Sequence, residues 1–72
     1  MTVFEIMSRF NSYTKFFIVD AGRDITNGEA VTLEDVKKEY PIEDRPQIGE
    51  ALEKQVRKLV AGIGCDWVIY CE

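Results

Sequence analysis

The two cysteines, Cys65 and Cys71, are the strongest nucleophiles in this 72-residue chain. A cysteine acts as a nucleophile only when a neighbouring base or a helix N-terminus lowers the pKa of its thiol. The sequence contains no histidine, so the commonest general base, metal ligand and pH switch is missing. Cys65 also follows a glycine in a predicted turn. We therefore expect both cysteines to be packing or surface residues, and we predict that the protein is not an enzyme.

Carboxylates are the next candidates, because magnesium or calcium needs several converging oxygen ligands. Asp20 and Asp24 flank a predicted turn. Glu34 and Asp35 begin a predicted helix, whose positive N-terminus favours acidic residues. None of the four has the spacing of a calcium-binding loop. The segment Gly62-Ile63-Gly64 lacks the Lys and Ser/Thr that end a phosphate-binding loop. We predict no catalytic residue, no metal site and no cofactor.

A basic cluster, Lys54, Arg57 and Lys58, offers a nucleic-acid contact. If residues 47–61 form a helix, these side chains share one face at spacings of three and four. Two glutamates lie beside them in the sequence, which favours a solvated surface whose charges pair with each other. Binding of nucleic acid or a nucleotide by a small dimer is therefore the alternative function.

Aromatic residues give the best functional lead. Tyr13 and Phe17 share one face of a predicted strand, whereas Trp67 and Tyr70 lie on opposite faces of another. Two small helices can cover only one face of a sheet, and an apolar face that no helix covers needs a partner. Trp and Tyr are also frequent at interface centres. We predict a protein interface at Tyr13, Phe17, Trp67 and Tyr70; a fully intramolecular core is the alternative.

Local patterns predict the elements of the first half. Thr2 and Glu5 form a capping box before a helix that reaches Phe10. Residues 13–20 are aromatic and β-branched, as in a strand, and residues 25–30 form a weaker edge strand interrupted by Gly28. Two further predictions complete this half: Thr32 and Asp35 make a second capping signature, and a helix runs from Leu33 to about Tyr40, before Pro41.

The second half is ambiguous between helix and strand. Residues 41–47 are a polar connection. Residues 56–63 favour a strand that turns through Gly64-Cys65-Asp66 into a secure strand over residues 67–71. A helix over about 47–61 also fits the apolar spacing. We predict an α+β fold in which a small antiparallel sheet has helices packed on one face, in the order α-β-β-α-β-β, with the third strand replaced by a helix in the alternative reading.

Composition indicates one small globular domain spanning residues 1–72, with 46% apolar residues. Domains of this size usually need a metal, disulfides or a partner, and a partner, including a homodimer, fits best here. The net charge of −4 argues against binding to phosphates and is compatible with a basic partner surface. The sequence shows neither a signal peptide nor an apolar run of about 18 residues, so we expect a cytoplasmic protein without membrane contact.

As a pattern over most of its length, the chain resembles small proteins of phages and prophages in Gram-positive bacteria. These proteins have an N-terminal helix, a strand that ends in Asp and a closing Val-Ile-Tyr strand. The matching residues are Tyr13, Thr14, Lys15, Ile18, Asp20, Gly28, Val68, Ile69 and Tyr70. The resemblance implies an accessory protein that binds a host or phage protein, in its sharpest form an inhibitor of a host defence system. It carries no catalytic motif.

Overall fold

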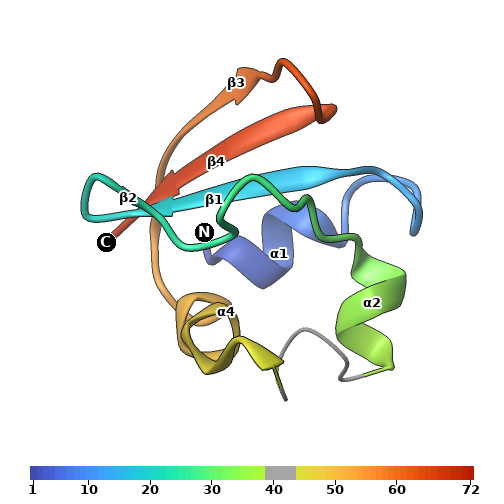
Figure 1. Ribbon diagram of the computed structural model, residues 1–72, viewed down its shortest axis with the longest axis horizontal. Coiled ribbons are helices and arrows are strands. Elements are labelled where there is room, and N and C mark those ends of the chain that lie inside the picture. The colour runs from blue at the N-terminus through green and yellow to red at the C-terminus, as the bar shows by residue number, and fades with distance from the viewer. Residues whose placement is uncertain (39–43) are drawn as a thin grey trace.

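The computed structural model describes residues 1–38 and 44–72. Within them, three helices and four strands are arranged as a sheet with the helices on one side (Figure 1). The elements are α1 (Val3–Met7), β1 (Phe16–Asp20), β2 (Arg23–Asp24), α2 (Leu33–Lys37), α4 (Pro46–Ala51), β3 (Val56–Ala61) and β4 (Trp67–Cys71). The fold class is therefore α+β, with helices on one face as the sequence indicated.

The sheet has the order β2-β1-β4-β3 and is mixed. Its two central strands, β1 and β4, run parallel, with Phe16 opposite Trp67 and Asp20 opposite Cys71. The outer pairs, β1–β2 and β3–β4, are antiparallel. The expectation of an antiparallel sheet was wrong for the central pair. A parallel pair needs a long crossover, and here the segment from β2 to β3, including α2 and α4, supplies it.

The core lies between the sheet and the helices. Its largest fully buried side chains come from β1, β4, α1 and α4. They include Phe16, Ile18, Ile69, Met7 and Ile48, each of which is 0% exposed. Phe10, after α1, adds an edge-on contact with the ring of Phe16 at 5.6 Å between centroids. This layer buries apolar area from every helix and so holds them on the same face of the sheet.

Both predicted capping boxes are present. The hydroxyl of Thr2 accepts from the N–H of Glu5, whose carboxylate accepts from the N–H of Thr2. Thr32 and Asp35 form the same reciprocal pair at the start of α2. The helix α1 is shorter than expected, because it ends at Met7 rather than Phe10, and α2 runs from Leu33 to Lys37. The predicted end of the second helix at Tyr40 and Pro41 lies outside the described residues.

The turn between β1 and β2 consists of two residues, Ala21 and Gly22, which have φ values of 52° and 84°. Positive φ at both positions matches the twist of a tight two-residue hairpin. The returning strand β2 covers only Arg23–Asp24, which precede the segment where a strand was expected. Asn27 and Gly28 also have positive φ, which is incompatible with a strand over residues 25–30. The prediction of that strand was wrong, because the edge strand β2 lies within the segment that was predicted as a turn.

The ambiguous second half contains both a helix and a hairpin. Pro46 stands in the first turn of α4, where its missing N–H costs nothing, and the helix ends at Ala51. β3 then follows and turns into β4, as the hairpin interpretation predicted. A helix over 47–61 was therefore wrong in extent. The predicted polar connection over 41–47 falls partly outside the described residues, and Pro46 and Gln47 belong to α4.

Candidate functional site

The face of the sheet opposite the helices carries a group of apolar side chains. Side chains alternate along a strand, so Phe16 and Ile18 point toward the helices and Phe17 and Val19 point away. Val68 and Tyr70 point away from the helices in the same manner, and Val60 lies opposite Val68 in the register. We call this surface the open face; its residues are Phe17, Val19, Lys58, Val60, Val68 and Tyr70.

Strand register arranges the open face in two rows. Phe17 is paired with Val68, and Val68 with Val60, which gives one apolar row across β1, β4 and β3. The second row joins Val19, Tyr70 and Lys58 in the same strand order. The ammonium nitrogen of Lys58 lies 4.7 Å from the centroid of the Tyr70 ring, within reach of a cation–π interaction.

All five apolar side chains of the open face are half-buried. Their neighbours on the helix side, Phe16, Ile18 and Ile69, are fully buried. The described helices lie beneath the other face, so none of them covers these rows (Figure 1). The open face therefore has the apolar content of an interface centre together with access to solvent.

A shallow hollow adjoins the second row of the open face. Its volume is ≈ 560 Å³, and Val19, Gly22, Lys58 and Tyr70 are among its lining residues. Arg57 lines it as well and forms an ion pair with Glu72, in which both side chains are largely exposed. The hollow thus combines an aromatic ring, a backbone without a side chain at Gly22, and two cations.

The four predicted interface residues do not lie together. Phe17 and Tyr70 are on the open face. Trp67 lies on the helix side, with its ring 5.5 Å from that of Phe10. Tyr13 is 71% exposed and precedes β1 in a turn, where its N–H donates to Oδ1 of Asn11. The strand starts at Phe16 instead of Tyr13, so the expected sharing of a strand face by Tyr13 and Phe17 was wrong.

Sequence reasoning did not select Val19, Val60 and Val68 as site residues. Their alternation with buried neighbours was visible in the sequence, but valine alone gives no functional signal. The register of β3 against β4 brings Val60 beside Val68, and that pairing decides the shape of the surface. A search for alternating positions on both strands of the predicted hairpin would have found these residues.

The predicted basic cluster is dispersed by the fold. Lys54 follows α4 and donates to Oδ2 of Asp20 at 2.6 Å. This hydrogen bond raises the pKa of Lys54 above its ordinary value, although burial acts in the opposite direction. Arg57 pairs with Glu72, and Lys58 lies over Tyr70. Because the helix ends at Ala51, the spacing of three and four no longer places the three cations on one face.

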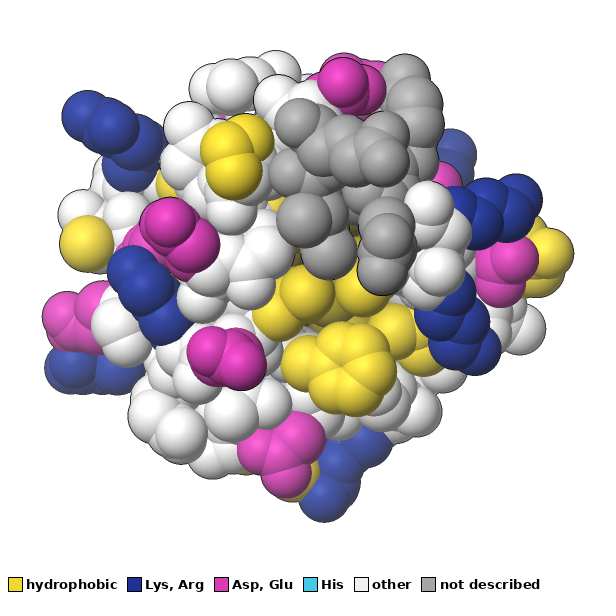
Figure 2. All heavy atoms as spheres, turned by 90° about the horizontal axis from the view of Figure 1, so that it is seen from below, with side chains coloured by type: hydrophobic (Ala, Val, Ile, Leu, Met, Phe, Trp, Pro, Cys, Tyr) yellow, Lys and Arg dark blue, Asp and Glu magenta, His cyan; other side chains and the backbone are white. Residues whose placement is uncertain are grey.

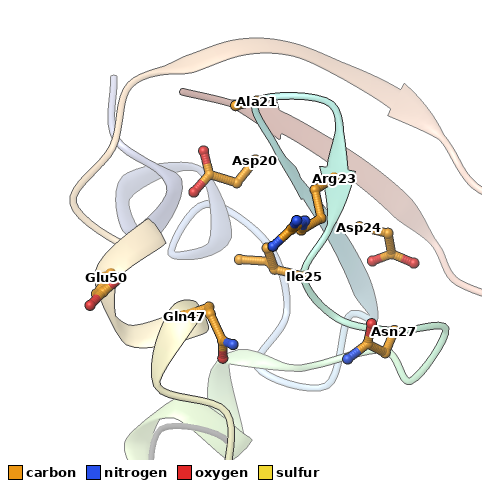
Figure 3. Close-up of a pocket in the computed structure, with 8 residues that line it drawn as sticks. All are labelled: Asp20, Ala21, Arg23, Asp24, Ile25, Asn27, Gln47 and Glu50. Atoms are coloured by element: carbon orange, nitrogen blue, oxygen red, sulfur yellow. The ribbon is translucent and has the colours of Figure 1, made fainter.

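A hollow with a volume of ≈ 660 Å³ lies between the β1–β2 turn and α4 (Figure 3). Asp20, Asp24 and Glu50 line it, but their carboxylates point in different directions (Figure 3). No group of three or more acidic or cysteine side chains among residues 1–38 and 44–72 could hold a metal ion. The hollow therefore lacks converging ligands.

The two cysteines have different surroundings. Cys71 is buried opposite Asp20, and burial, followed by the charge of Asp20, raises the pKa of its thiol. A raised pKa keeps the thiol protonated and poorly nucleophilic. Cys65 is half-buried in the β3–β4 loop, where its thiol donates to the carbonyl of Trp67 at 3.3 Å. Neither environment is that of an activated nucleophile.

The helix side of the molecule also exposes apolar surface. Figure 2 views this side and shows a group of hydrophobic side chains with basic and acidic side chains distributed around it. A hollow of ≈ 550 Å³ between α1 and α4 is lined by Phe4, Leu52 and Glu53 among others. Phe4 is 45% exposed. Unlike the open face, this hollow has no ordered rows of side chains set by strand register.

No protein-family model matches this chain, and no curated protein or solved structure matches it. In the part of the chain that the structure describes, no helix has the length and apolar character needed to cross a bilayer.

Proposed function

We infer that the protein is a non-catalytic binding module that recognises another protein through its open face. The observation that carries this proposal is the pair of rows, Phe17–Val68–Val60 and Val19–Tyr70–Lys58, on a face without a covering helix among the described residues. Aromatic and aliphatic side chains at the centre of such a surface, with charges at its margin, are typical of protein interfaces.

Phe17 and Tyr70 are the proposed anchors of this surface. Both are half-buried, and they project from β1 and β4, the two strands that are paired on both sides within the sheet. A rigid aromatic side chain loses little conformational freedom on binding, so its burial in a partner's pocket contributes strongly to affinity. Val68 lies beside Phe17 in the first row and Val60 follows it, so these two valines extend the contact from Phe17 toward β3.

The finer proposal is that the bound protein is a host defence factor and that this protein is its phage-encoded inhibitor, acting in the cytoplasm. It is supported by the resemblance to small phage proteins, including the Tyr13–Asp20 and Val68–Tyr70 segments. An inhibitor without chemistry of its own would act by occluding a surface. A homodimer through the open face is the simplest other use of the same residues.

The test of the binding module is a comparison of three variants in a capture experiment followed by calorimetry. A near-stoichiometric protein retained from host lysate is purified, and its affinity for the wild type is measured. Tyr70→Ser and Phe17→Ser should each weaken binding by about 2 kcal/mol, close to 30-fold. Tyr13→Ser, which changes an exposed ring outside the strands, should leave affinity unchanged.

Unfolding of each variant in urea provides the folding control for this comparison. A folded Tyr70→Ser protein that binds as tightly as the wild type would remove the open face from consideration. Loss of binding in Tyr13→Ser alone would instead move the interface to the turn before β1. The identity of the captured protein decides the finer proposal, because a defence factor is expected and a protein of any other role would contradict it.

Binding of single-stranded nucleic acid is a second candidate, supported by one specific observation. Phe17 and Tyr70 present aromatic rings on adjacent strands of a sheet, and Lys58 lies beside Tyr70. Bases stack on such rings while cations contact the phosphates. Titration with oligothymidylate over roughly 50 to 200 mM salt tests this candidate, since affinity should fall steeply with salt. Absence of binding at low salt would exclude it.

A further inference from the structure

The outer side of β3 has backbone groups that face away from the sheet. The N–H of Gly62 donates to the carbonyl of Asp66, and hydrogen-bonded pairs recur at every second residue of an antiparallel ladder. Lys58 and Val60 therefore direct their N–H and C=O groups toward β4, with which they are paired. The intervening residues, Leu59 and Ala61, direct theirs outward.

The bonding of β4 supports this assignment independently. The N–H of Trp67 donates to the carbonyl of Lys15, and the carbonyl of Cys71 accepts from the N–H of Ala21. Both bonding partners flank β1, so the backbone groups of Trp67 and Cys71, and of every second residue between them, point toward β1. The backbone groups of Val68 and Tyr70 must then point toward β3. Strand order leaves β3 at the margin of the sheet.

The chain already pairs an extended segment with the beginning of this edge. Thr2 forms an antiparallel bridge with Gln55, and the N–H of Val56 donates to the carbonyl of Met1 at 2.8 Å. Beyond Val56, none of the described residues is bonded to the outward groups of Leu59 and Ala61. The same edge is thus occupied at its start and open further along.

Protection against unwanted pairing is confined to the first part of the edge. A register shift lies between Val56 and Lys58, and Arg57 and Lys58 are exposed cations. Bulges and charged side chains are the usual means of blocking an edge strand. The following residues, Leu59 to Ala61, are apolar. An added strand therefore needs a negative charge opposite the cations, whereas no charge opposes its backbone pairing with Leu59 to Ala61.

The alternation of side chains along a strand determines which side chains of an added strand would lie on the open face. Residues placed opposite Lys58 and Val60 would emerge on the open face, beside the second and first rows. Lys58 takes part in none of the ion pairs of the described residues, whereas Arg57 is held by Glu72. Although the whole chain has a net charge of −4, this edge carries a positive charge at Lys58, which a carboxylate of the added strand would complement.

We propose that the edge of β3 from Lys58 to Ala61 binds an extended segment of a partner protein as an added strand, with an acidic side chain at Lys58 and an apolar side chain at Val60. The inference rests on the proposed function, since the added side chains continue the open face. Main-chain hydrogen bonds at Leu59 and Ala61 supply affinity, and the two side chains supply selectivity.

The experiment selects short random peptides against the immobilised wild type and measures the affinity of the selected peptides for matched variants. Ala61→Pro removes one outward N–H, a substitution that edge strands tolerate, and Ala61→Thr retains it. Lys58→Glu reverses the charge at the edge, and Lys37→Glu makes the same change on α2, where the side chain is exposed. Urea unfolding verifies that every variant is folded.

The expected result is selection of peptides that alternate acidic and apolar residues. Ala61→Pro and Lys58→Glu should each lower the affinity for these peptides by about tenfold or more. Ala61→Thr and Lys37→Glu should change the affinity by less than about twofold. Peptides that bind Ala61→Pro as tightly as the wild type but are lost on Phe17→Ser would overturn strand addition and leave the proposed function intact.

Other outcomes overturn the inference in distinguishable ways. If the wild type retains no peptide beyond the level of a folded Phe17→Ser/Tyr70→Ser double variant, the proposed function fails together with the strand addition. If sedimentation shows a wild-type dimer that Ala61→Pro converts to a monomer, the edge is occupied by a second copy of this chain. Oligothymidylate that displaces the selected peptides equally from the wild type and Ala61→Pro would assign the face to nucleic acid.

Discussion

The ammonium nitrogen of Lys54 lies 2.6 Å from Oδ2 of Asp20 and joins the turn after α4 to the carboxyl end of β1. Asp20 is 14% exposed, and its other oxygen, Oδ1, is buried without a hydrogen-bond partner among the described residues. A carboxylate in this position depends on its cation, because an uncompensated buried charge is strongly destabilising.

Replacing Lys54 with Met should therefore lower the urea midpoint of unfolding. Removal of both partners in Asp20→Asn/Lys54→Met should restore part of the loss, because the unpaired carboxylate is gone. The matched control is Lys38→Met, which breaks an exposed helical pair with Glu34 at 3.9 Å and should hardly change the midpoint. Equal midpoints for Lys54→Met and Lys38→Met would contradict a structural role for the Asp20 pair.

Trp67 is expected to act in the core. Its ring packs against that of Phe10 on the helix side, so Trp67→Ala should reduce the free energy of unfolding by about 3 kcal/mol. Chemical denaturation followed by circular dichroism measures this change, since the variant loses the chain's single tryptophan. A folded Trp67→Ala protein of wild-type stability with impaired partner binding would return Trp67 to the interface.

Gly62 leaves room for the thiol of Cys65. A Cβ atom at position 62 would lie 2.2 Å from Sγ of Cys65, which is far inside van der Waals contact. We expect Gly62→Ala to destabilise the protein by about 1–2 kcal/mol, because the cysteine side chain must leave its rotamer. The second variant, Gly62→Ala/Cys65→Ala, should recover most of that loss in equilibrium unfolding. Failure of Cys65→Ala to relieve the strain would show that the backbone of the loop is responsible.

Asp24 should make stability depend on acidic pH. Burial disfavours its ionised form, but hydrogen bonds from the side chain and N–H of Thr26 and from the N–H of Gly28 outweigh this effect and lower its pKa below 3.8. The ionised group thus stabilises the fold above about pH 4, and the contribution disappears as pH falls through the folded-state pKa.

The measurement for Asp24 is the urea midpoint from neutral to strongly acidic pH. Asp24→Asn should be less stable than the wild type at neutral pH and should approach it at the acidic limit. Glu29→Gln is a suitable control, because Glu29 is exposed and its carboxylate makes no hydrogen bond among the described residues. A constant difference between Asp24→Asn and the wild type at all pH values would contradict the role of charge.

Local features of this fold were predictable from the sequence. The capping boxes at Thr2 and Thr32 involve residues three positions apart, so a short segment contains all the information that they require. The strand at Trp67–Cys71 was likewise evident from its β-branched and aromatic residues. The prediction of a strand over residues 25–30 was wrong because Asn27 and Gly28 form a turn with positive φ, in which the N–H of Gly28 donates to the Asp24 carboxylate.

Relationships across the sheet were not predictable by the same means. The parallel pairing of β1 with β4 connects residues far apart in sequence, and no local pattern distinguishes it from an antiparallel alternative. The assignment of Trp67 to the helix side depends on where Phe10 packs. The placement of Trp67 and Tyr70 on opposite faces of their strand was predicted correctly, because alternation within a strand is a local property.

The parallel centre of the sheet has a consequence for folding kinetics. The N–H of Lys15 donates to the Asp66 carboxylate, 51 positions further along, and the β1–β4 pairs that follow span similar separations. Forming them closes most of the chain into a single loop before any central contact is gained. Refolding should therefore be slower than in a helical domain of equal size. A fragment lacking β4 would leave β1 with the two-residue partner β2 and the single bridge between Phe16 and Val31.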